Sequence, residues 1–327
     1  MRGGARRALI FGISGQDGAY LANLLLDCGY KVFGTSRDRE IRSFHNLETL
    51  GVAEQISLSS ATPTDFRSVF AVIDAVQPDE IYNLAGQSSV RLSFDQPVET
   101  VHSMVDGTLN ILEAIRMLGG RCRFYQASSS ESFGNIGEAP ADESTAFRPR
   151  SPYGVGKAAA HWAVANYRES YGLFACAGIL FNHESPLRPA RFATQKIIRG
   201  AADIADGKTD RLALGRLDIS RDWGWAPEYV EAMHRIISHD TPEDFVIATG
   251  TARSLENFVE RTFACFGLNW RDHVEVDSAL LRPSDISHSV GNPAKAMREL
   301  HWRAKVAMPD LVDRLVEAEL RRRRDLT

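Results

Sequence analysis

Two kinds of segment alternate along the first half of the chain. Short, nearly continuous apolar runs indicate buried strands, and longer segments with apolar residues every three or four positions indicate helices. The predicted strands cover Ala8–Ile13, Lys31–Thr35, Ile56–Leu58, Glu80–Leu84, Arg123–Ala127 and Phe174–Phe181. The helices between them cover Tyr20–Cys28, Asp65–Val76, Val98–Leu118 and Pro152–Tyr171. This alternation predicts an α/β protein with a Rossmann-type, doubly wound parallel sheet.

The predicted helices have recognisable ends and inward faces. Gly29 ends the first helix, and Thr64 is expected to cap the helix that begins at Asp65. The long helix Val98–Leu118 is expected to turn one apolar stripe inward, formed by Val101, Val105, Leu109, Leu112 and Ile115. Right-handed crossovers then place ligand sites at the carboxyl ends of the strands.

The second half of the chain is less regular. Helices are expected near Thr194–Ala205, Glu228–Ile237, Leu255–Phe266 and Pro309–Arg323, with a strand at Phe245–Thr249. We predict two interleaved domains: a dinucleotide-binding domain of residues 1–181 and about 218–250, and a smaller, irregular α/β substrate-binding domain of about 182–217 and 251–327. The basic run Arg321–Arg324 is expected to be a solvated helix end, with a binding tail as the alternative.

Composition narrows the class of protein. Of the 327 residues, 44% are hydrophobic and 24% are charged, as in ordinary globular proteins. A net charge of -4 provides no basic field for nucleic acid, and no apolar run approaches the ~20 residues that span a membrane. No metal-ligand cluster is visible in the sequence. The cysteines lie in apolar runs without a Cys-x-x-Cys pair, which predicts buried free thiols in a reducing cytoplasm: Cys28, Cys122, Cys176 and Cys265.

A glycine-rich turn follows the first predicted strand. The segment Gly12–Gly18 has the spacing Gly-x-x-Gly-x-x-Gly and leads into the first helix. Glycines in such a turn let the backbone approach a pyrophosphate, and the helix N-terminus supplies N–H donors. The predicted cofactor contacts are Gly12, Ser14, Gly15, Gln16, Asp17 and Gly18. The same glycines are also compatible with a plain turn.

The end of the second predicted strand bears on the choice of dinucleotide. A carboxylate there binds the ribose hydroxyls of NAD, whereas an arginine accommodates the 2′-phosphate of NADP. The first charged residue in this sequence is Arg37, and no acid precedes it. NADP is therefore the predicted cofactor, although Asp38 keeps NAD open, and Arg37 and Arg39 as solvated loop residues are an alternative.

A Tyr-x-x-x-Lys pair, Tyr153 and Lys157, lies on a predicted helix. Positions i and i+4 share a face, so the ammonium can approach the phenol and lower its pKa. Such a tyrosine can take a proton from a carbinol as hydride leaves for a nicotinamide. The preceding strand leads into Ser128–Glu131, where a hydroxyl can donate to the reacting oxygen and the Glu131 carboxylate can act as acid or base. A structural tyrosine and a solvent-facing Glu131 are the alternatives.

These residues carry a resemblance to a known family. The chain resembles the extended short-chain dehydrogenases/reductases and, among them, the GDP-mannose 4,6-dehydratases. The matching stretches include Gly12–Leu21, Pro78–Ala85 with Gln87 and Ser88, Tyr125–Gly134, Arg148–Lys157, Asn166–Cys176, Gly178–Pro186, Arg221–Gly224 with Tyr229–Met233, Pro242–Gly250, and Arg282 with Pro283. The most specific of them is Gly178–Pro186, which reads Gly-Ile-Leu-Phe-Asn-His-Glu-Ser-Pro.

The resemblance implies a lyase that converts GDP-mannose to GDP-4-keto-6-deoxymannose with recycling of bound NADP. It implies that Ser129 steadies the C4 oxygen, that Tyr153 beside Lys157 is the base at C4, and that Glu131 eliminates water across C5 and C6. It adds Leu84 and Ala85 as cofactor contacts, and Ser88, Asn182, Glu184, Lys196, Arg221 and Arg282 as GDP-sugar contacts. It also implies a homodimer or homotetramer, in which the loop 37–42 reaches a neighbour's cofactor.

Several residues depart from the usual pattern of that family. They are Leu187 to Pro189, Gln195, Asp285, Ser287 and Thr62 to Asp65. These positions concern the hexose and adenine contacts, so a GDP-manno-heptose 4,6-dehydratase is an alternative. A sugar-nucleotide epimerase or reductase and a non-catalytic NADP-binding regulator are further alternatives. Glu131 argues against the first two, and the full Ser129, Glu131, Tyr153 and Lys157 set argues against the last.

Overall fold

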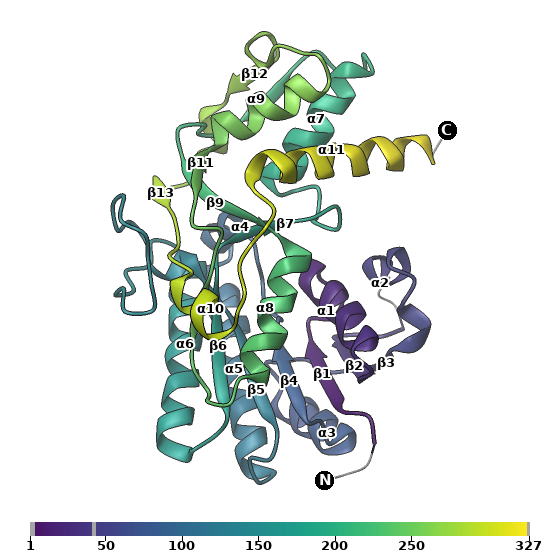
Figure 1. Cartoon of the computed structure of the whole chain (residues 1–327), viewed down its shortest axis with the longest axis vertical. Coiled ribbons are helices and arrows are strands. Elements are labelled where there is room, and N and C mark those ends of the chain that lie inside the picture. Colours follow the sequence, from purple (N-terminus) through teal and green to yellow (C-terminus); the bar gives the residue numbers. More distant parts are fainter. Residues whose placement is uncertain (1–3, 41–43, 326–327) are drawn as a thin grey trace.

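Seven parallel strands form the main sheet of the molecule (Figure 1). The computed structural model describes residues 4–40 and 44–325. The sheet has the order β10-β6-β5-β4-β1-β2-β3. Its strands are β1 (Arg7–Phe11), β2 (Lys31–Ser36), β3 (Ser57–Ser60), β4 (Glu80–Asn83), β5 (Arg123–Ser129), β6 (Ala175–Leu180) and β10 (Phe245–Ile247). The predicted α/β class is confirmed, and every predicted strand is present with its ends shifted.

Helices cover both faces of this sheet (Figure 1). One face carries α1 (Gln16–Asp27) and α8 (Ala226–Ser238), and the other carries α3 (Phe66–Val76), α5 (Pro97–Met117) and α6 (Pro152–Tyr171). Successive side chains of a strand point to opposite faces. Ala8 and Ile10 of β1 therefore join the hydrophobic core under α1 and α8, whereas Leu9 joins the core under α3 and α5. Burial on both faces explains the nearly continuous apolar runs.

The second half of the chain builds a smaller layer at the carboxyl ends of these strands (Figure 1). A four-stranded sheet contains β7 (Asn182–Glu184), β9 (Ser220–Trp225), β11 (Ala252–Ser254) and β13 (His288–Ser289), and β8 (Leu212–Leu214) pairs with β12 (Val274–Val276). The helices α7 (Ala193–Ala205), α9 (Leu255–Cys265) and α11 (Met308–Arg324) pack around a separate hydrophobic core. The remaining short helices are α2 (His45–Thr49), α4 (Val90–Asp95), α10 (Ala294–Glu299), η1 (Ala53–Gln55), η2 (Ser130–Ser132), η3 (Trp270–Asp272) and η4 (Ser278–Leu280).

The stretch 218–250 contributes to both layers. Its strand β10 belongs to the seven-stranded sheet, and its helix α8 packs on one face of that sheet. Its strand β9 belongs to the four-stranded sheet, where it pairs with β7, β11 and β13. The chain therefore passes between the layers inside this stretch. The domain limits given above stay a prediction.

Some local expectations were wrong. The first helix begins at Gln16 rather than Tyr20, so the glycine turn runs directly into the helix. Asp65, not Thr64, caps α3, because its carboxylate accepts from the N–H groups of the first turn. Of the predicted inward stripe of α5, Leu112 and Ile115 are buried and Val101 and Val105 are partly buried, whereas Leu109 is 37% exposed.

Two predictions about charged and thiol groups also need correction. Cys122 and Cys176 are buried free thiols, but Cys28 and Cys265 are exposed. The end of α11 is not simply solvated, because Arg323 forms ion pairs with Asp203 and with other acids nearby, and this fastens α11 to α7. Among the described residues, no helix has the length and apolar character needed to cross a membrane. In the same part of the chain, no three His, Cys, Asp or Glu side chains are grouped for a metal ion.

Candidate active site

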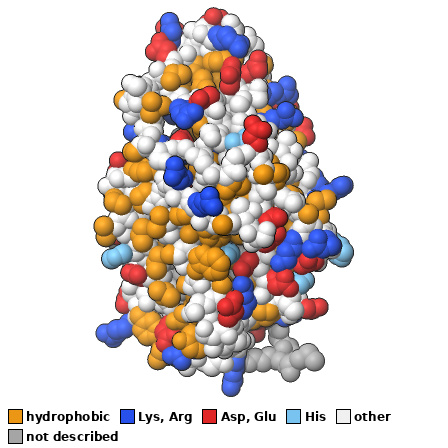
Figure 2. Space-filling model, turned by 90° about the vertical axis from the view of Figure 1, so that its left-hand side faces the viewer, with side chains coloured by type: hydrophobic (Ala, Val, Ile, Leu, Met, Phe, Trp, Pro, Cys, Tyr) orange, Lys and Arg blue, Asp and Glu red, His pale blue; other side chains and the backbone are white. Residues whose placement is uncertain are grey.

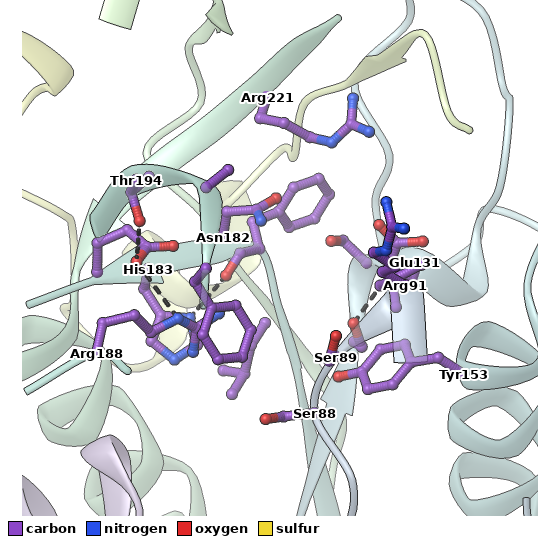
Figure 3. Close-up of a pocket in the computed structure, with 18 of the residues that line it drawn as sticks. Ser88, Ser89, Arg91, Glu131, Tyr153, Asn182, His183, Arg188, Thr194 and Arg221 are labelled. Atoms are coloured by element: carbon purple, nitrogen blue, oxygen red, sulfur yellow. Dashed lines mark hydrogen bonds and ion pairs between the residues drawn. The ribbon is translucent and has the colours of Figure 1, made fainter. Parts of the chain in front are cut away.

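A cavity of about 570 Å³ lies where the two layers meet, at the carboxyl ends of β4, β5 and β6. The predicted catalytic residues and all the predicted GDP-sugar contacts line it. In Figure 3, Glu131 and Tyr153 lie on one side of the cavity, and Asn182, His183 and Thr194 lie on the other. We call the first side the catalytic wall (Ser129, Glu131, Tyr153 and Lys157) and the second, together with Lys196, Arg221 and Arg282, the recognition wall.

The catalytic wall is built by the connection from β5 to α6. Ser151 caps α6 by accepting from the Gly154 N–H, and Pro152 occupies the first turn. Tyr153 and Lys157 then lie one turn apart, with the Lys157 Nζ 5.8 Å from the centre of the phenol ring. The Ser129 hydroxyl hydrogen-bonds the Tyr153 phenol. The predicted pair and hydroxyl therefore come together in one cavity.

Burial controls the protonation of the Tyr–Lys pair. It raises the pKa of Tyr153 to about 12, against the opposing hydrogen bond from Ser129. It also lowers the pKa of Lys157 to about 8. The Lys157 ammonium donates to the Ala127 carbonyl oxygen at 2.8 Å rather than to the phenol. The expectation that Lys157 by itself lowers the phenol pKa is therefore wrong for the protein alone.

Glu131 lies in η2, directly after β5, and faces the cavity (Figure 3). Burial raises the pKa of its carboxyl group, and the charges of Arg221 and Arg282 oppose that rise. A carboxyl group with a raised pKa exchanges protons more readily near neutral pH. Glu131 therefore faces the cavity rather than the solvent, and its raised pKa suits a group that takes or gives a proton.

The glycine turn has the close contacts that a dinucleotide fold requires. Gly12 has φ +87°, and a Cβ there would lie 2.8 Å from the Ala85 backbone nitrogen. A Cβ on Gly18 would lie 2.4 Å from the Gly12 carbonyl oxygen. Gly15 begins α1 without a side-chain cap, so the first-turn N–H groups have no side-chain acceptor. This geometry fits a pyrophosphate against the turn.

The predicted cofactor contacts divide into two groups. Asp17, Leu84 and Ala85 line the cavity together with Tyr153 and Lys157. The others do not line it: Gly12, Ser14, Gly15, Gln16, Gly18 and Arg37. The Gln16 side chain is buried and bonded to Asp17, Ser185 and the His183 backbone. Arg37 is exposed and directly follows β2.

The recognition wall is cationic and comes from separate elements. The cavity is lined by eight basic side chains, namely Arg91, Lys157, Arg188, Arg191, Lys196, Arg216, Arg221 and Arg282, and by four carboxylates, namely Asp17, Glu131, Glu184 and Asp285. Arg221 of β9 and Arg282 in the loop after η4 share Asp285, at 2.9 and 3.3 Å. The Lys196 ammonium donates to the Ala213 carbonyl oxygen. This excess of positive charge favours an anionic ligand.

Polar contacts also orient the other predicted GDP-sugar contacts. Glu184 accepts from the Thr194 hydroxyl at 2.8 Å and lies 3.4 Å from Arg188. Asn182 and Ser88 face the cavity from opposite layers (Figure 3). All six predicted contacts therefore share one cavity.

Sequence reasoning missed several residues that line the cavity. Arg91 of α4 donates to the Leu280 carbonyl oxygen at 3.1 Å and so ties α4 to η4. The guanidinium carbon of Arg188 lies 4.0 Å from the centre of the Phe192 ring. His183 lies inside the family-specific run Gly178–Pro186, and Arg188 lies just after it. Their position in or beside this run could have marked both as candidate site residues. For Arg91 no such local signal exists.

Comparisons with solved structures identify the fold. The fold matches a dTDP-glucose 4,6-dehydratase from Bacillus anthracis in complex with NAD, with a TM-score of 0.84, 18% identity and 97% of each chain covered. It also matches RMD from Pseudomonas aeruginosa complexed with NADPH, with a TM-score of 0.79, 21% identity, and 97% and 98% of the two chains covered. The chain therefore has the fold of the extended short-chain dehydrogenases/reductases.

Sequence comparison then identifies the family. The model of the GDP-mannose 4,6 dehydratase family matches residues 9–315. GDP-mannose 4,6 dehydratase 2 of Arabidopsis thaliana is 43% identical, covering 96% of this chain and 86% of the plant protein. The Homo sapiens GDP-mannose 4,6 dehydratase is 42% identical, with 96% and 91% covered. The chain belongs to the GDP-mannose 4,6-dehydratase family, and the predicted resemblance is confirmed.

Proposed function

We propose that this protein is a hydro-lyase that converts GDP-mannose to GDP-4-keto-6-deoxymannose. The observation that carries the proposal is Glu131, whose carboxyl group faces the same cavity as the Tyr153 phenol. Oxidation alone needs the Tyr–Lys pair and a hydride acceptor, whereas elimination of water also needs an acid or base beside it. Membership of the family supports the same substrate and reaction.

The residues of the glycine turn and of the β4 end would hold a nicotinamide dinucleotide. The close contact of Gly12 with Ala85 and the uncapped start of α1 support this assignment. When bound, the oxidised nicotinamide supplies a hydride acceptor, a positive charge near the phenol and, once reduced, a hydride donor. Arg37 after β2 supports NADP over NAD.

At C4, Tyr153 removes the hydroxyl proton as the carbon is oxidised. Burial holds the pKa of Tyr153 at about 12, and the Ser129 hydrogen bond acts against that rise and so favours the phenolate. Ser129 donates a hydrogen bond to the C4 oxygen as it becomes a carbonyl. Lys157, fixed by the Ala127 carbonyl oxygen, holds the ribose with its remaining N–H donors.

At C5 and C6, Glu131 carries out the elimination. The new 4-keto group makes the C5 proton acidic, and the Glu131 carboxylate takes it. The same carboxyl group returns a proton to the C6 hydroxyl, which leaves as water. Reduction at C6 and reprotonation at C5 complete the 6-deoxy sugar, so the overall reaction is redox-neutral.

The recognition wall would bind the GDP part of the substrate. Arg221, Arg282 and Lys196 are proposed to contact the diphosphate and its nucleoside, because guanidinium and ammonium groups bind phosphate oxygens. Asp285 sets the direction of both guanidinium groups. Asn182, Glu184 and Ser88 are proposed to orient the diphosphate and sugar hydroxyls.

The test is a single incubation of the purified chain with GDP-mannose in deuterated water, without added cofactor. We expect loss of one water and gain of one deuterium at C5, because the C5 proton exchanges through Glu131 and a retained cofactor recycles. The product is followed by mass spectrometry. Unchanged GDP-mannose, even with NADP added, would contradict the proposal and direct the next trial to a GDP-manno-heptose.

We also propose that the protein works as a homodimer or homotetramer in the cytoplasm. Exposed apolar side chains lie on α5 and α6, which pack side by side: Val98, Leu109, Val155 and Trp162. Figure 2 shows hydrophobic side chains spread over the lower part of one face of the molecule. The free thiols suit a reducing compartment.

Light scattering of the purified protein should give a multiple of the chain mass. The substitution W162R should reduce the measured mass, whereas M297R, at exposed Met297 of α10, should leave it unchanged.

A further inference from the structure

A buried ion pair connects the glycine turn to the recognition wall. Asp17 lies in the first turn of α1, and its Oδ2 is 2.9 Å from the Nε2 of His183 in β7. The other oxygen, Oδ1, accepts from the Gln16 amide at 2.9 Å. β1 leads into α1 from the seven-stranded sheet, whereas β7 pairs with β9 in the four-stranded sheet. The pair therefore joins the two layers across the site.

The contacts of the His183 ring suit a positive charge. Its Nδ1 lies 2.8 Å from the Phe181 carbonyl oxygen, and its Nε2 faces the Asp17 carboxylate. The carbonyl oxygen and an ionised Asp17 are both acceptors, so only a ring with a proton on each nitrogen can donate to both. Burial opposes that charge, but the charge and hydrogen bond of Asp17 outweigh it and raise the pKa of His183. Burial likewise acts against ionisation of Asp17, and His183 outweighs it and lowers the pKa of Asp17 to about 2.

The surroundings hold the imidazole rigidly. The ring stacks on Tyr229 of α8 with 4.6 Å between ring centres, and Tyr229 meets Trp302 edge to face. The charged groups that face the pair are Arg188, after β7, and Lys157, on α6. The neighbours of His183 along β7 are Asn182 and Glu184, which line the cavity. A shift of His183 would thus move both.

The network around the pair continues into α7. Ser185 donates to the Gln16 side-chain oxygen at 2.8 Å, and the Gln195 amide donates to the Ser185 carbonyl oxygen at 3.0 Å. All three side chains are buried. The glycine turn, β7 and α7 are therefore held by one continuous set of polar contacts. The ion pair is its charged member.

We propose that Asp17 and His183 are a charge-compensated positioning pair for cofactor binding. The positive imidazole cancels the carboxylate charge beside the turn that receives the pyrophosphate, and it ties that turn to the substrate-facing strand. When His183 loses its proton, a buried carboxylate is left unpaired next to an anionic ligand, and the cofactor is held less tightly. This inference rests on the proposed function, because it assumes that a dinucleotide binds the turn.

The experiment compares NADPH affinity of the full-length chain across pH, measured by fluorescence titration after removal of bound cofactor. Wild-type affinity should be highest at low pH and should fall as the pH rises through the raised pKa of His183. H183Q removes the cation beside Asp17, so it should bind about tenfold more weakly than the wild type at a pH just below the pKa of His183, and its profile should be flat across the pH range in which His183 titrates in the wild type. D17N removes the negative charge, so it should also give a flat profile but a smaller loss than H183Q.

The matched control is D27N, which makes the same change at the exposed end of α1. It should retain both the affinity and the pH profile of the wild type. Thermal unfolding of each variant shows whether it folds. If H183Q does not fold, the pH profile of D17N alone tests the inference. A D17N profile parallel to that of the wild type, or equal losses in H183Q and D17N, would overturn the inference alone. A wild-type chain that binds no NADPH or NADP at all would overturn the proposed function together with it.

Discussion

The two walls of the cavity are built in different ways. The four residues of the catalytic wall come from one continuous stretch, from the end of β5 to the first turns of α6. The cations of the recognition wall come from separate elements, namely Lys196 of α7, Arg221 of β9 and Arg282 after η4. The first wall is set by local backbone geometry, and the second depends on long-range pairing.

This difference predicts different consequences of substitution. Loss of a catalytic side chain removes a proton transfer and leaves its neighbours in place, because the helix and strand hold them. Loss of a recognition cation also changes the field at Glu131, because Arg221, Arg282 and Asp285 all act on its carboxyl group. We therefore expect rate effects from one wall, and binding and pH effects from the other.

The largest effect should follow Y153F. Removal of the phenol oxygen eliminates the base at C4, so kcat should fall about a thousandfold. The value of kcat is measured from the rate of GDP-mannose turnover, followed by mass spectrometry. Y171F, at an exposed position of the same helix, is the matched control and should be as active as the wild type. Comparable activity of Y153F and Y171F would remove Tyr153 from the mechanism.

A smaller but more specific loss should follow E131Q. The amide cannot take the C5 proton, so formation of the 6-deoxy product should fall about a hundredfold while oxidation at C4 continues. Reduced cofactor should then accumulate, which its fluorescence reports. E138Q, at an exposed position of the connection to α6, should behave as the wild type. Full dehydration by E131Q would rule out the proposed role of Glu131.

The recognition wall is tested by R282Q. The charge of Arg282 holds down the pKa of Glu131, so its removal should raise that pKa. Because Glu131 is proposed to act as a base at C5, the acid limb of the profile of kcat/KM against pH should move to higher pH. KM should also rise about tenfold through the lost phosphate contact. The control is R211Q, which removes an exposed arginine that pairs with Glu275 and should change neither the acid limb nor KM. An unmoved acid limb in R282Q would contradict the proposed effect of Arg282 on Glu131.

The smallest expected effect is on stability, in K157M. Burial lowers the pKa of Lys157 from 10.5 to about 8, so the folded chain bears the cost of a buried charge below about pH 8. Between these values the unfolded chain holds the proton and the folded chain does not, so the cost fades as pH rises. At pH 7, K157M should therefore be inactive yet ~1 kcal/mol more stable, and the gain should shrink towards pH 10.5.

Urea unfolding at the two pH values measures this difference. K208M, which changes an exposed lysine, is the control and should leave the stability nearly unchanged at both. A K157M chain that is less stable at pH 7 would mean that the hydrogen bond to the Ala127 carbonyl oxygen outweighs the burial of the charge.

By itself, the sequence determined the parallel sheet, the glycine turn and the catalytic wall. Periodicity and i, i+4 spacing are local properties, so the spacing of Tyr153 and Lys157 is enough to place both on one helix face. The run Gly178–Pro186 identified the family for the same reason.

Only the tertiary structure decided which distant polar groups meet. Asp285 between Arg221 and Arg282, Arg91 against η4, and His183 against Asp17 all join positions far apart in the chain. The pKa values of Asp17, His183 and Arg221 depend on burial and on partners from other elements, which no local pattern encodes. The expected effect of Lys157 on Tyr153 was wrong for that reason, because burial, not the neighbouring cation, dominates the pKa of the phenol.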